Sequence, residues 1–287
     1  MLIKAYRAHF IKELLSLYDE KEIESFFYII LEKNHQLKRI DLALNPEMIL
    51  DGQHLKQWKN IVSDLKIHKP IQYILQETFF YNLPFYVDEN VLIPRPETEE
   101  LVDLVLSNNP TIQQSKNPKI VDIGTGSGCI AIALAATIPN ATVFAIDVSE
   151  KALEVAQKNA NLNEVNVTFL QKNILETNDL EHAFDIIVSN PPYVRNLEKA
   201  EINANVLEYE PHLALFVEDN DALLFYRKIA DLAKKNLKPN GQLYFEINQY
   251  LGKETVELLQ ELGFQNIELK KDIYGNDRMI SCQLLVT

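Results

Sequence analysis

The sequence lacks several features that would mark other classes of protein. It has 287 residues but only two cysteines, Cys129 and Cys282, and neither belongs to a CxxC pair. This disfavours a disulfide framework and a metal site. No stretch approaches the roughly eighteen apolar residues of a membrane helix, and the start of the chain has no signal-peptide cleavage pattern. We therefore expect a cytoplasmic protein that contacts no membrane and holds no metal.

Basic residues are scarce relative to acidic ones, and the imbalance is confined to one part of the chain. The net charge is -13; residues 1–80 carry 11 Lys and Arg against 11 Asp and Glu, whereas the remainder carries 17 against 30. Duplex nucleic acids are normally held by a basic surface that contacts their phosphates. We therefore expect no direct nucleic-acid binding, and we expect a monomer.

The periodicity of apolar residues changes along the chain and predicts three parts. In residues 1–76 the spacing is helical and predicts a small helical bundle, whose third helix starts near Pro46 and carries Ile49 and Trp58. Residues 77–90 predict a β-hairpin linker with its loop at Asn82-Leu83-Pro84. Residues 91–287 alternate strands with helices and predict a doubly wound α/β sheet. Its seven strands are expected at 120–123, 142–146, 167–170, 184–188, 242–247, 267–269 and 279–286, the last antiparallel.

Polar or glycine residues follow each of the first four predicted strands. Three glycines come after the first, in the sequence Gly124-Thr125-Gly126-Ser127-Gly128, and Asp147, Asn173 and Asn190 follow the next three. Ligands bind at the carboxyl ends of strands in open α/β sheets. Glycines let a ligand approach the backbone closely, and Asp147 can accept hydrogen bonds from ribose hydroxyls. The alternative for Asp147 is a helix-capping acid.

The glycine loop favours S-adenosyl-L-methionine (SAM) over a dinucleotide. Its spacing is GxGxG rather than GxGxxG, and Asp122 stands two positions before it. A carboxylate there would repel a pyrophosphate but would attract a cationic amino-acid tail. The alternative is that Asp122 is a buried structural acid.

The stretch Asn190-Pro191-Pro192-Tyr193 follows the apolar strand 184–188. Its two prolines prevent the strand from continuing. The Asn190 side-chain oxygen and the Pro191 carbonyl can accept both hydrogens of a planar NH2 group, and Tyr193 can cover its flat face. Such a group is a poor nucleophile, so holding it in line with a methyl donor would favour transfer. On its own, Asn-Pro more often marks a simple turn.

The chain resembles, along nearly its full length, the HemK/PrmC family of protein-(glutamine-N5) methyltransferases that modify peptide chain release factors. The resemblance rests on four motifs: Leu92-Ile93-Pro94-Arg95-Pro96-Glu97-Thr98-Glu99, Asp122 to Gly128, Asn190 to Tyr193, and Tyr209-Glu210-Pro211 with Ala214-Leu215. It implies a Rossmann-like, SAM-dependent methyltransferase domain after the helical domain. It also implies methylation of the glutamine in the Gly-Gly-Gln (GGQ) loop of class 1 release factors.

The resemblance also implies roles for particular residues. The cofactor would be bound by Asp122, Gly124, Thr125, Gly126, Ser127, Gly128, Asp147, Asn173, Ile174 and Asn190. The glutamine amide would be held by Asn190, Pro191, Pro192 and Tyr193, with Arg95 in the same site, and Asn190, Pro191 and Tyr193 would be catalytic. The helical domain would grip the release factor. Two places depart from the family pattern: Asn173-Ile174, where Asp and an aromatic are frequent, and Asn248, where glycine is more usual.

Two other functions share part of this evidence. An adenine-amino methyltransferase acting on DNA or RNA would carry the same proline motif and would flip its target base into the pocket, but the charge distribution argues against it. A non-catalytic SAM-binding scaffold would be expected to have lost Asn190 or Asp147, and both are present.

Overall fold

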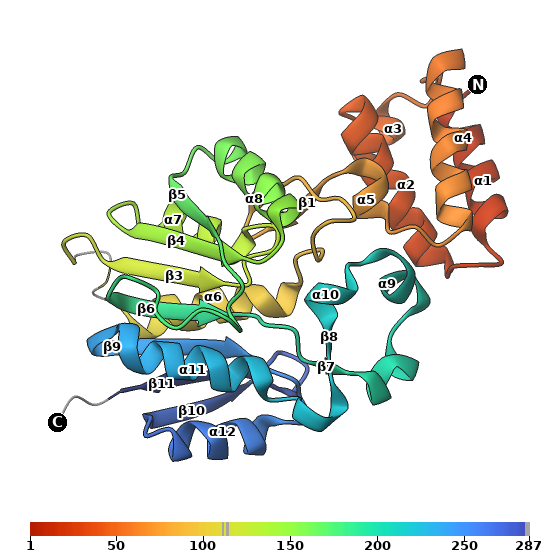
Figure 1. Ribbon diagram of the computed structural model, residues 1–287. Helices are drawn as coiled ribbons and strands as arrows, with labels where there is room; N and C mark the ends of the chain where they lie inside the picture. Colours follow the sequence, from red (N-terminus) through yellow and green to blue (C-terminus); the bar gives the residue numbers. More distant parts are fainter. Residues whose placement is uncertain (111, 113–114, 285–287) are drawn as a thin grey trace. The chain divides into compact units, whose positions relative to one another are not determined.

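The computed structural model describes residues 1–110, 112 and 115–284, which form two compact units (Figure 1). Unit 1 consists of Met1–Gln76 together with the short segment Ala204–Tyr209. Unit 2 contains the other described residues, from Glu77 to Asn203 and from Glu210 onward. The predicted hairpin lies in unit 2.

Unit 1 is a helical bundle around an aromatic core. Its helices are α1 (Ile3–Leu14), α2 (Glu20–His35), α3 (Arg39–Leu44), α4 (Gly52–Lys66), α5 (Ile71–Leu75) and α9 (Ala204–Tyr209). The rings of Phe10, Phe27 and Trp58 lie within 5.0–5.7 Å of one another, between ring centres, and all three are fully buried. The helical spacing of apolar residues predicted this core.

The third predicted helix was placed wrongly. The structure has two helices, α3 and α4, in that region, and α4 begins only at Gly52. Asp51 sets this start, because its carboxylate accepts the backbone N–H of His54 at 2.9 Å and so caps the helix. Pro46 lies in a turn instead, and Ile49, expected in the core, is 69% exposed.

The hairpin forms, but its turn begins one residue earlier than predicted and has two residues rather than three. Strands β1 (Thr78–Phe80) and β2 (Leu83–Phe85) pair antiparallel, with Pro84 opposite Phe79. The turn is Tyr81-Asn82, and both residues have positive φ (53° and 59°), as a two-residue hairpin turn requires. Glu99 stabilises this conformation, because its carboxylate accepts the Tyr81 N–H at 2.7 Å.

Unit 2 is built on the predicted seven-stranded sheet, in the order β10-β11-β9-β6-β3-β4-β5. The strands are β3 (Lys119–Ile123), β4 (Thr142–Asp147), β5 (Val167–Gln171), β6 (Phe184–Ser189), β9 (Leu237–Glu246), β10 (Gln265–Lys271) and β11 (Asp277–Gln283). Only β11 runs antiparallel to its neighbours, on both sides. The predicted fold class is confirmed; the predicted end of the last strand at Val286 lies outside the described residues.

Helices cover both faces of the sheet, because successive side chains along each strand point to opposite faces and most of them are apolar. One face packs against α6 (Pro96–Asn108), α7 (Cys129–Thr137) and α8 (Glu150–Leu162), and the other against α11 (Leu224–Asn236) and α12 (Gly252–Glu261). In β3, for example, Ile120 belongs to the first layer and Val121 to the second. None of the described helices is long and apolar enough to span a membrane.

The segment between β6 and α11 contains short ordered elements. These are β7 (Val194–Arg195), a 3-10 helix (Asn196–Glu201), α9, α10 (His212–Leu215), β8 (Phe216–Val217) and a 3-10 turn (Asp219–Asp221). β7 and β8 pair in parallel. The segment thereby returns α10 to the carboxyl end of β6, where Leu213 and Ala214 line a cavity.

Candidate active site

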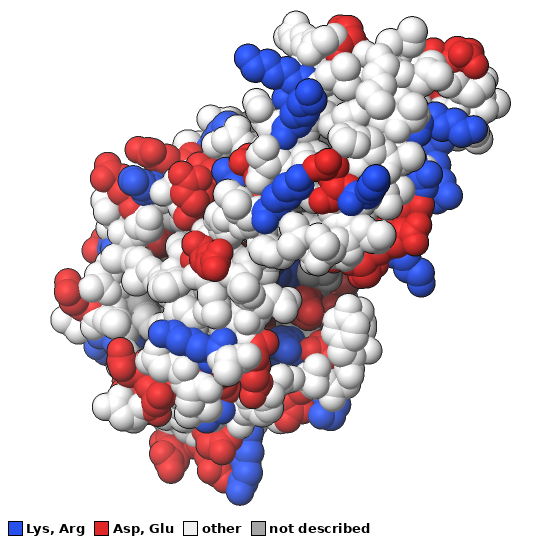
Figure 2. Space-filling model, turned by 90° about the vertical axis from the view of Figure 1, so that its right-hand side faces the viewer, with Lys and Arg blue, Asp and Glu red and all other residues white. Residues whose placement is uncertain are grey.

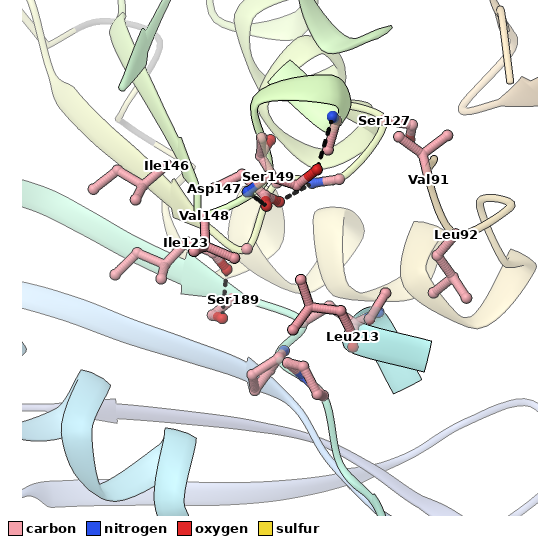
Figure 3. A pocket seen from close by; sticks show the side chains of 18 of the residues that line it. Val91, Leu92, Ile123, Ser127, Ile146, Asp147, Val148, Ser149, Ser189 and Leu213 are labelled. Atoms are coloured by element: carbon pink, nitrogen blue, oxygen red, sulfur yellow. Dashed lines mark hydrogen bonds between the residues drawn. The ribbon is translucent and has the colours of Figure 1, made fainter. Parts of the chain in front are cut away.

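A cavity of about 300 Å³ opens at the carboxyl ends of the central strands (Figure 3). Its wall comes from loops after β3, β4, β5 and β6, from residues 90–98 and from α10. Eleven of the residues predicted to form a site line it: Arg95, Gly124, Thr125, Gly126, Ser127, Asp147, Asn173, Ile174, Asn190, Pro191 and Pro192. The structure therefore brings together residues that are up to 97 positions apart in the chain, from Arg95 to Pro192.

The glycine loop turns sharply at the cavity. Gly124 and Gly126 have φ of 76° and 53°, a region that residues with side chains rarely adopt. The N–H groups of Gly124 and Thr125 donate to the Ile146 carbonyl at 2.8 and 3.0 Å, which ties the loop to β4. A Cβ at Gly126 would meet nothing within 4 Å, so the space above this loop is available to a ligand.

Asp147 ends β4 with both carboxylate oxygens engaged by the backbone (Figure 3). One oxygen accepts the N–H of Ser149 and the other the N–H of Gly126, each at 2.9 Å. Burial raises the pKa of this carboxyl, and the backbone hydrogen bonds oppose that rise. Each oxygen keeps a further lone pair for a ligand. Ser149, not Asp147, caps α8, since its hydroxyl accepts the Ala152 N–H at 3.2 Å.

Asn173 and Ile174 form the far wall of the cavity after β5. The Asn173 side-chain oxygen accepts the Leu175 N–H at 3.1 Å. This contact fixes the amide, so that its nitrogen is the group with donors to offer a ligand. Ile174 is 8% exposed and presents an apolar surface, which can contact the face of a flat ring.

Asp122 and Gly128 do not lie at the cavity wall. Asp122 is fully buried, and it accepts the Thr125 hydroxyl at 2.6 Å. Burial raises its pKa to about 7, although the Thr125 hydrogen bond acts in the opposite direction. A Cβ on Gly128 would approach Ile132 Cδ1 to 2.9 Å and Ala156 Cβ to 3.1 Å. Gly128 therefore permits close packing of α7 on α8, and Asp122 supports the loop from below.

Replacing Asp122 with asparagine should remove one contribution to stability that decreases as pH rises from about 4 to about 7. The folded carboxyl has a raised pKa of about 7, so the folded state binds the proton more tightly than the unfolded state does. Stability from this group is therefore highest below the unfolded pKa, about 4, and is lost as pH approaches 7. Asparagine does not titrate. Urea unfolding midpoints at pH 4.5 and 8 measure the difference.

The control for this prediction is Asp231→Asn, a change of the same kind at an exposed position of α11. It should leave the pH dependence as in the wild type. If Asp122→Asn retained the full wild-type dependence, the Asp122 carboxyl would not be the group that titrates.

Residues of the proline motif line both the large cavity and a second pocket of about 60 Å³. Asn190 and Arg95 line both, and Tyr193 and Glu246 line only the smaller one. Within the described part of the chain, the Pro191 carbonyl accepts no hydrogen bond. The smaller pocket is comparable in size to a few heavy atoms, and Asn190 separates it from the large cavity as a lining residue of both.

Comparisons with known proteins identify the family of the chain. Residues 7–75 match the family model described as "PrmC N-terminal domain", and residues 98–212 match "Methyltransferase small domain". A "Release factor glutamine methyltransferase" from Flavobacterium psychrophilum is 70% identical over 280 residues, covering 98% of both chains. The chain belongs to the release factor glutamine methyltransferase family.

Other members of this family and more distant structures complete the comparison. Proteins of the same name from Bacteroides thetaiotaomicron and Streptococcus pneumoniae are 40% and 42% identical and cover 96% and 95% of this chain, and 97% and 95% of their own. The hMettl16 catalytic domain in complex with an RNA hairpin superposes with a TM-score of 0.54 at 17% identity, covering 72% of this chain and 77% of its own. That likeness shows the fold alone.

The family motif around Arg95 and the one around Glu210 meet in the structure. The Arg95 guanidinium lies 2.6 Å from Glu210 Oε1, and the Ile93 N–H donates to Glu210 Oε2 at 3.3 Å. The Glu210 side chain is 1% exposed, whereas that of Arg95 is 34% exposed. The pair fixes the two segments that frame the mouth of the cavity.

Asn248, where the resemblance led us to expect a glycine, is buried and uses its hydrogen-bonding groups within the protein. Its Nδ2 donates to the Tyr193 carbonyl and to Glu198 Oε2, both at 2.9 Å, and its oxygen accepts the Tyr250 N–H at 2.9 Å. Asn248 thus anchors the backbone just after the prolines.

Sequence reasoning missed two residues that the structure brings to the candidate site, Thr98 and Glu246. Thr98 lines the large cavity and Glu246 the small one. Thr98 belongs to the motif Leu92 to Glu99, but a threonine commonly has a structural role, so the sequence alone did not single it out. Glu246 ends β9, but the strand predicted there, 242–247, ran past it, so extending the same rule to the fifth strand would have pointed to Asn248 instead.

Proposed function

We propose that this protein transfers a methyl group to the side-chain amide nitrogen of the glutamine in the GGQ loop of class 1 release factors. The observation that carries the proposal is the pair of acceptors at the junction of the two pockets. The Asn190 side chain and the unpaired Pro191 carbonyl lie side by side in the chain, directly after a buried strand. Two such acceptors match the two hydrogens of a carboxamide.

We infer that the large cavity binds SAM. Its volume is within the range of small-molecule sites, and the space above Gly126 is open. Asp147 would accept the ribose hydroxyls, and Asn173 and Ile174 would contact the adenine. Gly124, Thr125 and Ser127 would line the methionine end, while Asp122 and Gly128 would support that loop from outside the cavity. When bound, SAM supplies a methyl group on a cationic sulfur.

The protein's part in the reaction is to orient the acceptor nitrogen. An amide nitrogen is a poor nucleophile because its lone pair is delocalised. Asn190 and Pro191 would fix both N–H bonds and would favour the positive charge that develops on the nitrogen. Pro192 and Tyr193 would confine the flat group, and Arg95 would border it. The methylated nitrogen is acidic enough to lose its proton without a dedicated base.

We further infer that unit 1 holds the release factor and that no nucleic acid binds directly. The part of the chain with the active site is acidic, and on the face shown in Figure 2 basic and acidic side chains are interspersed without a broad basic field. The pockets need no residue from a second copy, so a monomer would suffice. A substrate that acts in translation would place the enzyme in the cytoplasm.

The deciding experiment follows transfer of labelled methyl from SAM to six acceptors. These are a purified class 1 release factor, the same factor with its GGQ glutamine changed to alanine, and single-stranded and duplex DNA and RNA. Label is expected on the intact factor alone. Label on nucleic acid, with none on the factor, would overturn the proposed substrate in favour of an adenine-amino methyltransferase.

A further inference from the structure

The side chain of Asn190 is held by a chain of hydrogen bonds that the proposed function does not use. Asn190 Nδ2 lies 3.3 Å from Thr98 Oγ1, and Thr98 Oγ1 lies 2.6 Å from Glu246 Oε2. The other carboxylate oxygen, Oε1, accepts the Tyr193 hydroxyl at 3.1 Å. Thr98 and Glu246 are 3% and 2% exposed, so the chain runs through the protein interior.

The chemistry of these groups gives the chain a direction. A carboxylate can only accept, so the Thr98 hydroxyl donates its one hydrogen to Glu246. The Thr98 oxygen is then an acceptor, and it is the nitrogen of Asn190 that faces it. The amide oxygen of Asn190 is left as the group that a substrate meets. If Thr98 did not donate to Glu246, its hydroxyl could donate to Asn190 instead. The Asn190 amide would then turn over, and its NH2 group would face the NH2 group of the substrate.

Burial raises the pKa of Glu246, and the hydrogen bonds from Thr98 and Tyr193 and the positive charge of Arg278 offset only part of that rise. These two hydrogen bonds and this charge each favour the ionised form, in which the carboxylate accepts both hydroxyl hydrogens. Thr98 is held in place by its position in the first turn of α6, which Pro96 begins. Other groups of the protein thus hold Glu246 and Thr98 in place independently of any ligand.

We propose that Glu246 and Thr98 are positioning residues that set the orientation of the Asn190 carboxamide, so that its oxygen faces the acceptor amide of the substrate. This inference rests on the proposed function for the identity of that substrate. Neither residue touches the reacting atoms; both act through Asn190.

Thr98→Val tests the inference, because valine keeps the shape of threonine but can neither donate to Glu246 nor accept from Asn190. We expect kcat for methyl transfer to fall about 10- to 100-fold, with KM for the release factor and the affinity for SAM changed less than about 3-fold. Thr98→Ser, which keeps the hydroxyl, should restore most of kcat. The matched control is Thr255→Val, a buried threonine of α12, which should leave kcat as in the wild type.

Glu246→Leu is the second test. Leucine removes both acceptor oxygens, so the Thr98 hydroxyl loses the acceptor that makes it turn its oxygen toward Asn190. It should lower kcat as Thr98→Val does. The double variant should be no slower than the slower single variant, because both changes interrupt the same chain. Fully additive losses, or equal losses of SAM affinity and kcat, would show that the two residues serve folding alone.

A readout without substrate separates this inference from the proposed function. The side-chain 15N–1H resonances of Asn190, assigned by their loss in Asn190→Ala, should shift in Thr98→Val and Glu246→Leu and stay in place in Thr98→Ser. Unchanged resonances in Thr98→Val would overturn the positioning role. If the wild type failed to label the release factor while the resonances moved as expected, the substrate would be wrong and the positioning role would stand.

Discussion

Asn190→Ala should reduce methyl transfer about 100- to 1,000-fold while leaving the affinity for SAM nearly unchanged. The large loss is expected because the Asn190 oxygen would both bind one hydrogen of the acceptor amide and stabilise charge that develops on its nitrogen. SAM affinity should persist because the residues proposed to bind the ribose and the adenine, Asp147, Asn173 and Ile174, lie on other strand ends. Single-turnover transfer to a release factor and calorimetric titration with SAM measure the two quantities.

The control for this variant is Asn266→Ala, at an exposed position of β10, which should transfer methyl at the wild-type rate. Near-normal turnover in Asn190→Ala would remove Asn190 from the mechanism. A parallel loss of SAM affinity would instead assign the residue to the cofactor site.

Asp147→Ala should have the opposite signature, with a Kd for SAM that rises about 100-fold and a transfer rate that recovers at high SAM concentration. A hydrogen bond to a charged group contributes about 1.5–3 kcal/mol, and Asp147 is proposed to accept two from the ribose. The variant also loses the bonds from Gly126 and Ser149 that shape the loop. Asp147→Asn should have a Kd for SAM between those of the wild type and Asp147→Ala, because asparagine keeps the side-chain volume of aspartate.

The matched control is Asp231→Ala, which removes an exposed carboxylate from α11 and should leave the Kd unchanged. If Asp147→Ala bound SAM as tightly as the wild type does, the ribose would have to be sought elsewhere in the cavity. If saturating SAM failed to restore transfer, Asp147 would also contribute to the reaction step.

Much of unit 2 was predictable from the sequence because its signals are local. A buried strand followed by a glycine loop or a polar residue specifies both an element and the edge of the sheet where the residue lies. Gly124, Asp147 and Asn190 were placed correctly at one cavity on this basis alone. The antiparallel last strand followed from the lack of room for a crossover.

Errors arose where the decisive interaction is a single hydrogen bond or a turn conformation. The start of α4 depends on one cap at Asp51, which competes with an equally plausible proline start at Pro46. The hairpin turn depends on a tyrosine, Tyr81, in a conformation that favours glycine or asparagine. Its stabilising partner, Glu99, is 18 positions away, and periodicity carries no information about such a contact.

The roles of Asp122, Thr98 and Glu246 needed coordinates for a different reason. A sequence shows which residue types are near a site but not which way a side chain faces. Asp122 was expected to face the cofactor and instead faces the Thr125 hydroxyl inside the protein. Thr98 and Glu246 are 148 positions apart and meet only because α6 packs against the end of β9.

The ion pair between Arg95 and Glu210 has a consequence for how related sequences can diverge. Losing the arginine alone would leave a carboxylate that is 1% exposed without its cation, a change that is far more damaging than losing both charges together. The residues at positions 95 and 210 should therefore be replaced together in evolution and not one at a time. In an alignment of relatives they should covary, and a sequence without a cation at the first position should also lack an acid at the second, although 115 positions separate them.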